Sequence, residues 1–256
     1  MTDPFRLDGK VALVTGGNSG LGEAIALAFA EAGARVVIAG RREQRNALTL
    51  RALGSAHRAV TLDVANEASV ERAVATAIED FGRLDILVNN AGVGQRASVM
   101  DLELEAWRHV LDINLTGAFL CTKHAARRMA AQGSGKIINI ASIYGLTAPS
   151  KGLQVAYTVS KHALVALTKV NAVELAAKGI QVNAVAPGWF FTEMTEELRG
   201  TAFEQSVCER APAGRWGETG DIVGACRFLA SPASDFVNGV ILPVDGGYTA
   251  SDGLRR

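Results

Sequence analysis

Residues 10–22, with the sequence KVALVTGGNSGLG, decide the fold of this 256-residue chain. The first half, residues 10–15, is a short run of mainly apolar and β-branched residues, which predicts a buried strand of a parallel sheet. Glycines at positions 16, 20 and 22 then lead into a helical pattern over residues 23–31. A strand, a glycine turn and a helix N-terminus together form the usual phosphate site of a dinucleotide, because N–H groups and the helix dipole face the anion.

The spacing of these glycines differs from the common G-x-G-x-x-G fingerprint. A tight strand-to-helix turn that binds nothing is therefore the alternative interpretation. In the favoured one, the turn and the start of the helix bind the cofactor through Gly16, Asn18, Ser19, Gly20, Leu21 and Gly22.

Short apolar runs alternate with helical patterns along the rest of the chain. Further strands are predicted at 35–39, 59–62, 84–88, 136–140, 181–185 and 240–244, and helices at 68–81, 103–131, 155–178 and 221–230. The apolar runs are nearly continuous, as in parallel strands that are covered on both faces. The sequence therefore predicts one α/β domain over residues 1–256, a doubly wound (Rossmann) parallel sheet between two layers of helices.

Composition restricts the class of protein. With 48% hydrophobic and 20% charged residues the chain can bury a sizeable core, which argues against disorder. The formal net charge is zero and no Lys/Arg cluster exceeds a pair, so nothing points to nucleic acid or an anionic membrane. The three cysteines lack metal or redox spacing, and no apolar run approaches the roughly 18 residues of a membrane span. We expect a soluble cytoplasmic protein without a metal.

Polar or turn-forming residues follow the predicted strands, at the edge where parallel sheets bind ligands. Besides the glycine turn they are Arg41, Asp63, Asn90, Ser142 and Pro187. The second strand ends in Arg41 and Arg42 where an acidic residue would select NAD, and a guanidinium there can pair with a 2′-phosphate. This favours NADP over NAD, although the glycine turn itself carries Ser19 and no basic residue. Two solvated loop arginines are the alternative.

Tyr157 and Lys161 are four residues apart in a predicted helix, so their side chains share one face, about 6 Å apart. A nearby ammonium favours the phenolate and lowers a tyrosine pKa. A phenol tuned towards neutrality is a usable general acid or base. Alone, the pair is more typical of a solvated helix face than of a catalytic site.

Together these residues resemble the short-chain dehydrogenase/reductase family over nearly the whole chain. The matching pieces are TGGNSGLG (15–22), DV (63–64), NNAG (89–92), Asn114, Ser142, YTVSK (157–161) and PGWFFT (187–192). The resemblance implies a seven-stranded parallel sheet, hydride transfer between an alcohol or carbonyl and a nicotinamide cofactor without a metal, and a homotetramer.

The resemblance also implies the role of individual residues. Tyr157 would be the acid/base, Lys161 would lower its pKa and bind the nicotinamide ribose, and Ser142 would hold the substrate oxygen. Asn114 would organise a water relay. Asp63 and Val64 would lie at the adenine, Asn90, Gly92, Pro187 and Gly188 along the cofactor, and Thr192 at the carboxamide. The alternatives are a backbone-satisfied polar residue for Asn114, a cap for Asp63 or Thr192, and a structural turn for Asn90 and Gly92.

Three further pieces, at 91–96, 187–195 and 210–217, look like gluconate 5-dehydrogenases and related sugar-acid or polyol dehydrogenases. A sugar acid needs a cation for its carboxylate, and we expect Arg96 to be that clamp, with Ser142, Tyr157 and Trp189 as further substrate contacts. Residues 189–216 would form an apolar lid over the site, with a surface subdomain as the alternative. The rival functions are a 3-oxoacyl carrier-protein reductase, a secondary-alcohol dehydrogenase and a nucleotide sensor without catalysis.

Overall fold

Seven parallel strands form one sheet in the order β3-β2-β1-β4-β5-β6-β7 in the computed structural model, which describes residues 3–149 and 152–252. The strands are β1 (Val11–Thr15), β2 (Arg35–Gly40), β3 (Arg58–Thr61), β4 (Ile86–Asn89), β5 (Gly135–Ile140), β6 (Ile180–Pro187) and β7 (Ile241–Val244). The predicted parallel α/β sheet is thus confirmed, with strand ends that differ by up to two residues.

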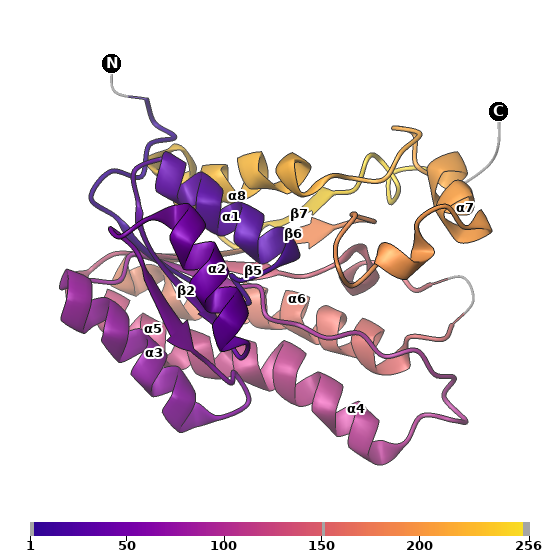
Figure 1. The fold of residues 1–256 in the computed structure, drawn as a ribbon, viewed down its shortest axis with the longest axis horizontal. Coiled ribbons are helices and arrows are strands. Elements are labelled where there is room, and N and C mark those ends of the chain that lie inside the picture. Colours follow the sequence, from indigo (N-terminus) through magenta and orange to yellow (C-terminus); the bar gives the residue numbers. More distant parts are fainter. Residues whose placement is uncertain (1–2, 150–151, 253–256) are drawn as a thin grey trace.

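Helices cover both faces of the sheet (Figure 1). They are α1 (Gly20–Glu31), α2 (Glu43–Leu53), α3 (Glu67–Phe81), α4 (Leu104–Leu111), α5 (Gly117–Gln132), α6 (Val155–Leu175), α7 (Ala202–Arg210) and α8 (Val223–Ala230). Helices α1 and α8 pack on one face through residues such as Phe29 and Leu229, and α2 lies on the same side. Helices α3, α5 and α6 cover the other face, through Val70, Leu120 and Ala172 among others. The inner strands β1, β4, β5 and β6 are thereby buried on both sides, which explains their continuous apolar runs, whereas the edge strands β3 and β7 are mostly half-buried.

The strand order reverses between β1 and β4, which both pair in parallel and stand side by side. At such a switch point the following loops leave in opposite directions and open a crevice at the carboxyl ends of the strands. The glycine turn after β1 and residues 90–96 after β4 both enter this crevice, so the topology itself places the site.

Two helices that the sequence did not predict, α2 and α7, complete the fold. Helix α2 buries only polar side chains, Asn46 and Thr49, so its apolar periodicity is too weak to be recognised. The helix predicted over residues 103–131 is divided by a π-helical turn, Asp112–Thr116, between α4 and α5. No helix in the described ranges is long and apolar enough to cross a membrane.

Candidate active site

A cavity of about 780 Å³ opens at the carboxyl ends of the strands, and a second one of about 200 Å³ adjoins it. The larger cavity collects fifteen predicted residues, namely Gly16, Ser19, Gly20, Leu21, Arg42, Asn90, Gly92, Arg96, Ser142, Tyr157, Lys161, Pro187, Gly188, Trp189 and Thr192. The smaller one adds Asn18, Arg41, Asp63 and Val64. Gly22 and Asn114 line neither cavity in the described part of the chain.

The glycine turn is shaped by close backbone contacts. Gly16 and Gly20 have φ of 62° and 54°, a region that favours glycine. A Cβ at Gly22 would lie 2.2 Å from the Gly16 carbonyl oxygen, so α1 can approach the turn only without a side chain there. The Asn90 side chain donates hydrogen bonds to the Thr15 and Gly16 carbonyls (3.0 and 3.1 Å). Asn90 therefore holds the turn, the structural role named as its alternative, while it also lines the cavity.

The start of α1 suits an anion. Its N-cap, Ser19, makes no side-chain cap to the helix, and the first N–H groups of a helix have no intrahelical partner. The Ser19 hydroxyl instead accepts a hydrogen bond from Arg42 Nη2 at 3.0 Å. A helix N-terminus beside a guanidinium favours a phosphate.

The smaller cavity lies between the ends of β2 and β3. Asn18 is buried and donates to Asn46 Oδ1 at 2.7 Å, which ties the glycine turn to α2. Asp63 accepts from the Ala65 N–H at 3.0 Å and so caps its own turn, as its alternative proposed, while it also faces the cavity. Ser19, Arg42 and Gly92 line both cavities, so the passage between them runs past the glycine turn. This shape and chemistry fit a dinucleotide with its adenosine end in the smaller cavity.

Tyr157, Lys161 and Ser142 meet at the inner end of the larger cavity. Tyr157 and Lys161 project from the first turns of α6, and Lys161 Nζ lies 5.6 Å from the phenol ring centroid. Lys161 is buried and donates to the Ile140 carbonyl at 2.7 Å. The Ser142 hydroxyl accepts from the Tyr144 N–H at 3.1 Å, which leaves its own proton free to be donated.

Electrostatics in this cluster differ from the expectation. Burial raises the pKa of the Tyr157 phenol above its ordinary value, and a hydrogen bond with Ser142 opposes that shift. Burial also lowers the pKa of Lys161 to about 8. The expected lowering of the tyrosine pKa by the lysine is therefore wrong for the cavity as it stands, because desolvation destabilises the charged form of both groups.

Asn114 sits in the π-helical turn between α4 and α5 and is almost fully buried. Its side chain exchanges two hydrogen bonds with the backbone of Val93 and donates to Ser160 Oγ at 3.0 Å. Ser160 in turn donates to the Tyr157 carbonyl at 2.7 Å. Asn114 thus connects the loop after β4 to the helix that carries Tyr157, as a satisfied polar residue with a positioning role.

Residues 187–198 form the outer wall of the larger cavity. Thr192 stacks against the glycine turn, where its side chain would lie 3.4 Å from a Cβ at Gly20. The capping alternative for Thr192 is wrong, because the next helical turn, Glu196–Leu198, has Thr195 as its N-cap. Thr192 remains a candidate cofactor contact.

The end of the larger cavity around Trp189 is aromatic. Trp189 packs edge-on against Tyr144 and Phe203, with ring centroids 6.0 and 4.8 Å away. The Trp189 Nε1 is buried and has no hydrogen-bond partner among the described residues, which makes it a candidate donor to a ligand. Arg96 is half exposed and lies 3.7 Å from Glu197 on the opposite wall. The aromatic residues of 189–216 do pack a small core of their own, the alternative to a lid, yet Trp189 and Leu198 also line the cavity.

Sequence reasoning missed several residues of the site. Tyr144 faces the cavity, and burial raises its pKa well above the usual value. Ser160 lies within the recognised 157–161 motif but was assigned no role. Arg45 and Glu193, which meet across the cavity rim, are 148 positions apart, and no local pattern pairs them. The described residues contain no group of three or more His, Cys, Asp or Glu that could hold a metal ion.

Comparison with known proteins gives matches over nearly the whole chain. A family model described as enoyl-(acyl carrier protein) reductase matches residues 16–249. A 2-dehydro-3-deoxy-D-gluconate 5-dehydrogenase of Bacillus subtilis is 45% identical over 251 residues, covering 96% of this chain and 97% of the relative. A 3-oxoacyl-[acyl-carrier-protein] reductase of Synechocystis is 40% identical over 246 residues, covering 94% and 97%.

A solved structure shares the fold closely. The gluconate 5-dehydrogenase of Burkholderia cenocepacia, in complex with NADP and tartrate, superposes with a TM-score of 0.92 at 43% identity. The match covers 97% of this chain and 98% of that protein.

Proposed function

The chain belongs to the short-chain dehydrogenase/reductase family, and from this premise we propose that it interconverts an alcohol and a ketone on a sugar acid or polyol. NADP is the preferred cofactor of this proposal, with NAD as the alternative. The observation that carries it is the convergence of Ser142, Tyr157 and Lys161 on a cavity that continues past a phosphate-binding turn.

The bound nicotinamide would supply or accept the hydride, and the side chains would handle the proton. In ketone reduction, Ser142 donates a hydrogen bond to the substrate oxygen and neutral Tyr157 protonates that oxygen as it becomes an alkoxide. The raised pKa of Tyr157 keeps the phenol protonated and ready for this direction. In alcohol oxidation the phenolate takes the proton back, and the adjacent Lys161 ammonium stabilises the negative charge.

Asn114 and Lys161 would return the proton to solvent. A π-helical turn within a helix is often found at functional sites, and this one places Asn114 within reach of Ser160 on α6. Gly92 keeps the space between them open, since a Cβ there would lie 3.3 Å from Asn114 Oδ1 and 3.8 Å from Lys161 Nζ.

The preference for NADP is supported by the arginines after β2. Arg42 lines both cavities and contacts Ser19 at the start of α1, while Arg41 borders the smaller cavity. The related Burkholderia enzyme was solved with NADP. A 2′-phosphate at this end of the cofactor would meet guanidinium groups rather than a carboxylate from the end of β2.

A sugar acid suits the substrate side. Arg96 supplies a cation on one wall, and Ser142, Tyr157 and Trp189 supply hydrogen-bonding groups for hydroxyls or the carbonyl. Residues 189–216 would act as the lid that excludes water. The related Burkholderia structure contains tartrate, a hydroxylated carboxylate.

The acyl carrier protein alternative has less support. An acidic carrier would require a basic face near the cleft, and Lys123 on α5 is a cation that could contribute to one. Lys123 Nζ lies 2.7 Å from Glu67, so this lysine already has a close counter-ion within the chain, closer than the 3.7 Å between Arg96 and Glu197.

A substrate panel tests the proposal. Each of NADPH and NADH is combined with a keto sugar acid, a neutral ketose, a short ketone and a 3-oxoacyl thioester, and the oxidation of the cofactor is followed by absorbance. We expect the highest kcat/KM with the keto sugar acid and NADPH. Arg96→Ala should raise KM for the sugar acid about tenfold or more and leave KM for the ketose unchanged, while Arg72→Ala, on the exposed face of α3, should alter neither. Preference for the thioester, or an unchanged KM in Arg96→Ala, would contradict the substrate assignment.

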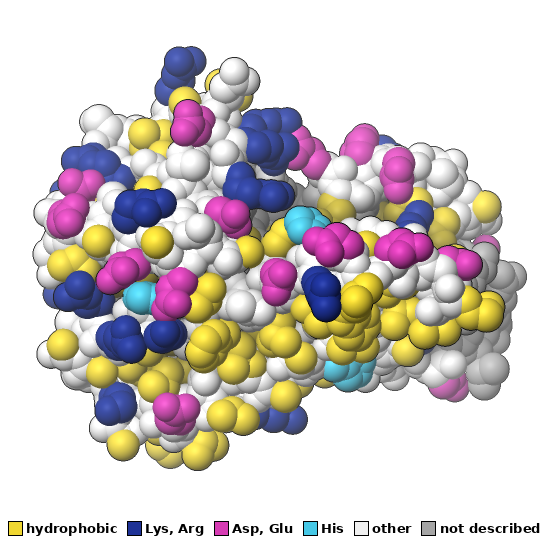
Figure 2. Space-filling view, turned by 90° about the horizontal axis from the view of Figure 1, so that it is seen from below, with side chains coloured by type: hydrophobic (Ala, Val, Ile, Leu, Met, Phe, Trp, Pro, Cys, Tyr) yellow, Lys and Arg dark blue, Asp and Glu magenta, His cyan; other side chains and the backbone are white. Residues whose placement is uncertain are grey.

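We also propose a homotetramer. Large apolar side chains are exposed on the outer helices, with Val173 82%, Val170 60% and Leu104 59% exposed. Contiguous exposed apolar patches on one face are typical of interfaces. Figure 2 shows apolar side chains gathered on the face formed by the lower helix layer of Figure 1.

The three free cysteines are compatible with a cytoplasmic location, which is part of the same proposal.

A further inference from the structure

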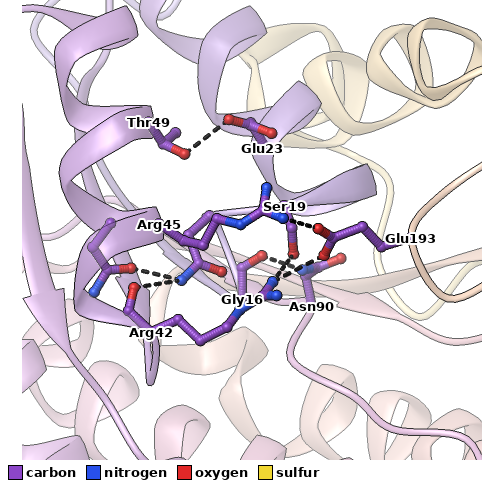
Figure 3. Close-up of polar contacts among 10 residues, drawn as sticks. Gly16, Ser19, Glu23, Arg42, Arg45, Thr49, Asn90 and Glu193 are labelled. Atoms are coloured by element: carbon purple, nitrogen blue, oxygen red, sulfur yellow. Dashed lines mark hydrogen bonds and ion pairs between the residues drawn. The ribbon is translucent and has the colours of Figure 1, made fainter.

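Glu193, on the outer wall of the larger cavity, forms ion pairs with two arginines from the opposite rim (Figure 3). Its Oε2 lies 3.1 Å from Arg42 Nη2, and its Oε1 pairs with Arg45 Nη2. Arg42 is the N-cap residue of α2 and Arg45 lies in its first turn, whereas Glu193 belongs to residues 189–216. The clasp, as we call Glu193 with Arg42 and Arg45, therefore joins the candidate lid to the end of β2.

The clasp stands at the position expected for a phosphate. Arg42 Nη2 also donates to Ser19 Oγ at 3.0 Å, and Ser19 and Arg42 line both cavities. Neighbouring Thr192 packs on the glycine turn. Glu193 thus brings a carboxylate to the two guanidinium groups beside the turn. The guanidinium N–H groups of an arginine can donate to carboxylate or to phosphate oxygens in the same bidentate geometry.

We propose that Glu193 is a specificity-determining residue that competes with the 2′-phosphate of the cofactor for Arg42 and Arg45. The inference rests on the proposed binding of a nicotinamide dinucleotide in these cavities. When a cofactor with a 2′-phosphate binds, the phosphate replaces the Glu193 carboxylate as the partner of Arg42 and Arg45. Residues 189–216 are then no longer held to α2. A cofactor without that phosphate leaves the clasp closed.

Competition predicts opposite effects from the two sides of one ion pair. Glu193→Gln removes the competitor, so NADP⁺ should bind more tightly. Arg45→Gln removes a phosphate ligand, so NADP⁺ should bind more weakly. A contact that only stabilised the fold would shift both variants in the same direction. Neither change should alter NAD⁺ affinity much, because NAD⁺ lacks the 2′-phosphate for which Glu193 is proposed to compete.

The first experiment measures Kd by isothermal titration calorimetry at fixed ionic strength. All three side chains are about half exposed, so each pairing is weakened by solvent and contributes little to affinity. For two pairings we expect Glu193→Gln to lower the Kd of NADP⁺ about three- to tenfold and the Kd of NAD⁺ by less than twofold. Glu196→Gln is the matched control, since it makes the same charge change three residues along the wall and its carboxylate pairs only with Arg199 among the described residues.

The second experiment follows the lid without any nicotinamide. Trp189 and Trp216 report on residues 189–216 through their mutual contact at 5.2 Å. Adenosine 2′,5′-bisphosphate should change the tryptophan fluorescence of the wild type, and adenosine 5′-monophosphate should not. Without any nucleotide, Glu193→Gln should already show the tryptophan fluorescence that the wild type shows with adenosine 2′,5′-bisphosphate bound.

The possible outcomes separate the two proposals. If the wild type binds neither NADP⁺ nor NAD⁺, the proposed function fails and this inference fails with it. If both bind but Glu193→Gln and Glu196→Gln have the same NADP⁺ affinity, the competition is refuted while the proposed function stands. Weaker NADP⁺ binding in both Glu193→Gln and Arg45→Gln would show that the clasp supports the site rather than competing for it.

Discussion

Replacing Lys161 by methionine should abolish turnover and, at the same time, make the protein more stable. The Lys161 ammonium is buried on α6 and forms no ion pair with a carboxylate of the described residues. A charge held in such a place for catalysis destabilises the folded state. Methionine has a similar length and carries no charge, so this substitution removes the buried charge without creating a cavity.

The magnitude follows from the pKa. Burial lowers the pKa of Lys161 from 10.5 to about 8, and one pKa unit corresponds to about 1.4 kcal/mol. At neutral pH the charge therefore destabilises the native state by about 3 kcal/mol. Methionine loses the hydrogen bond to the Ile140 carbonyl, worth about 1–2 kcal/mol. We expect the free energy of unfolding to rise by about 1–2 kcal/mol, or the Tm by roughly 2–8 °C in a chain of this size.

The pH dependence gives this prediction its sign. Between the native pKa of about 8 and the unfolded value of 10.5, the unfolded chain holds a proton that the folded protein has released. The stability of the wild type therefore gains from this group as pH rises through that window. Lys161→Met lacks the gain, so its advantage should be largest below about pH 8 and shrink towards pH 10.5.

Denaturant unfolding of wild type and variant across this pH range measures the effect. Lys169→Met, an exposed lysine two turns further along α6, is the control and should change stability little at any pH. The reasoning is refuted if Lys161→Met is less stable than the wild type at neutral pH, or if its advantage does not decrease as pH rises.

Three further predictions concern the turn, the serine and the assembly. Gly22→Ala would place a methyl group 2.2 Å from the Gly16 carbonyl oxygen. Thermal denaturation should therefore show a stability loss of about 1–3 kcal/mol, and NADP⁺ titration should show much weaker binding. Gly224→Ala is the control: its added methyl group would have no described neighbour within 4 Å, so neither stability nor binding should change. Ser142→Ala should lower kcat about 10- to 100-fold and leave the Kd of NADP⁺ unchanged, because it removes one hydrogen bond to the reacting oxygen; a change in Kd alone would contradict that role. Val173→Asp should reduce the mass seen by light scattering with an unchanged circular dichroism spectrum, and an unchanged mass would argue against an interface at this position.

The fold was largely predictable because its signals are local. A strand such as β1, buried on both faces, must be mainly apolar, and the glycine turn must lack side chains where Gly22 meets Gly16. Helix α2 escaped prediction for the opposite reason, since its buried positions are polar: Asn46 donates to backbone carbonyls and Thr49 to Glu23. Such burial is recognisable only once the partners are in place.

The gathering of the predicted residues around one pair of cavities could be anticipated from the sequence, whereas their electrostatics could not. Tyr157 and Lys161 are neighbours by helical spacing, and the structure places them with Ser142. The direction of the Tyr157 pKa shift depends on how much water the rest of the fold excludes. The four-residue spacing between Tyr157 and Lys161 does not indicate this. The pairing of Glu193 with Arg45 likewise follows from the path of the chain after β6, which no local pattern encodes.

The central claim is that Tyr157 transfers the proton in a hydride-transfer reaction. Tyr157→Phe removes only the phenol oxygen, so the cavity and the cofactor site should be preserved. With the best substrate and cofactor from the panel, we predict that kcat falls at least about 100-fold, while the Kd of NADP⁺ and the Tm stay close to wild type. Full turnover in Tyr157→Phe would contradict the account.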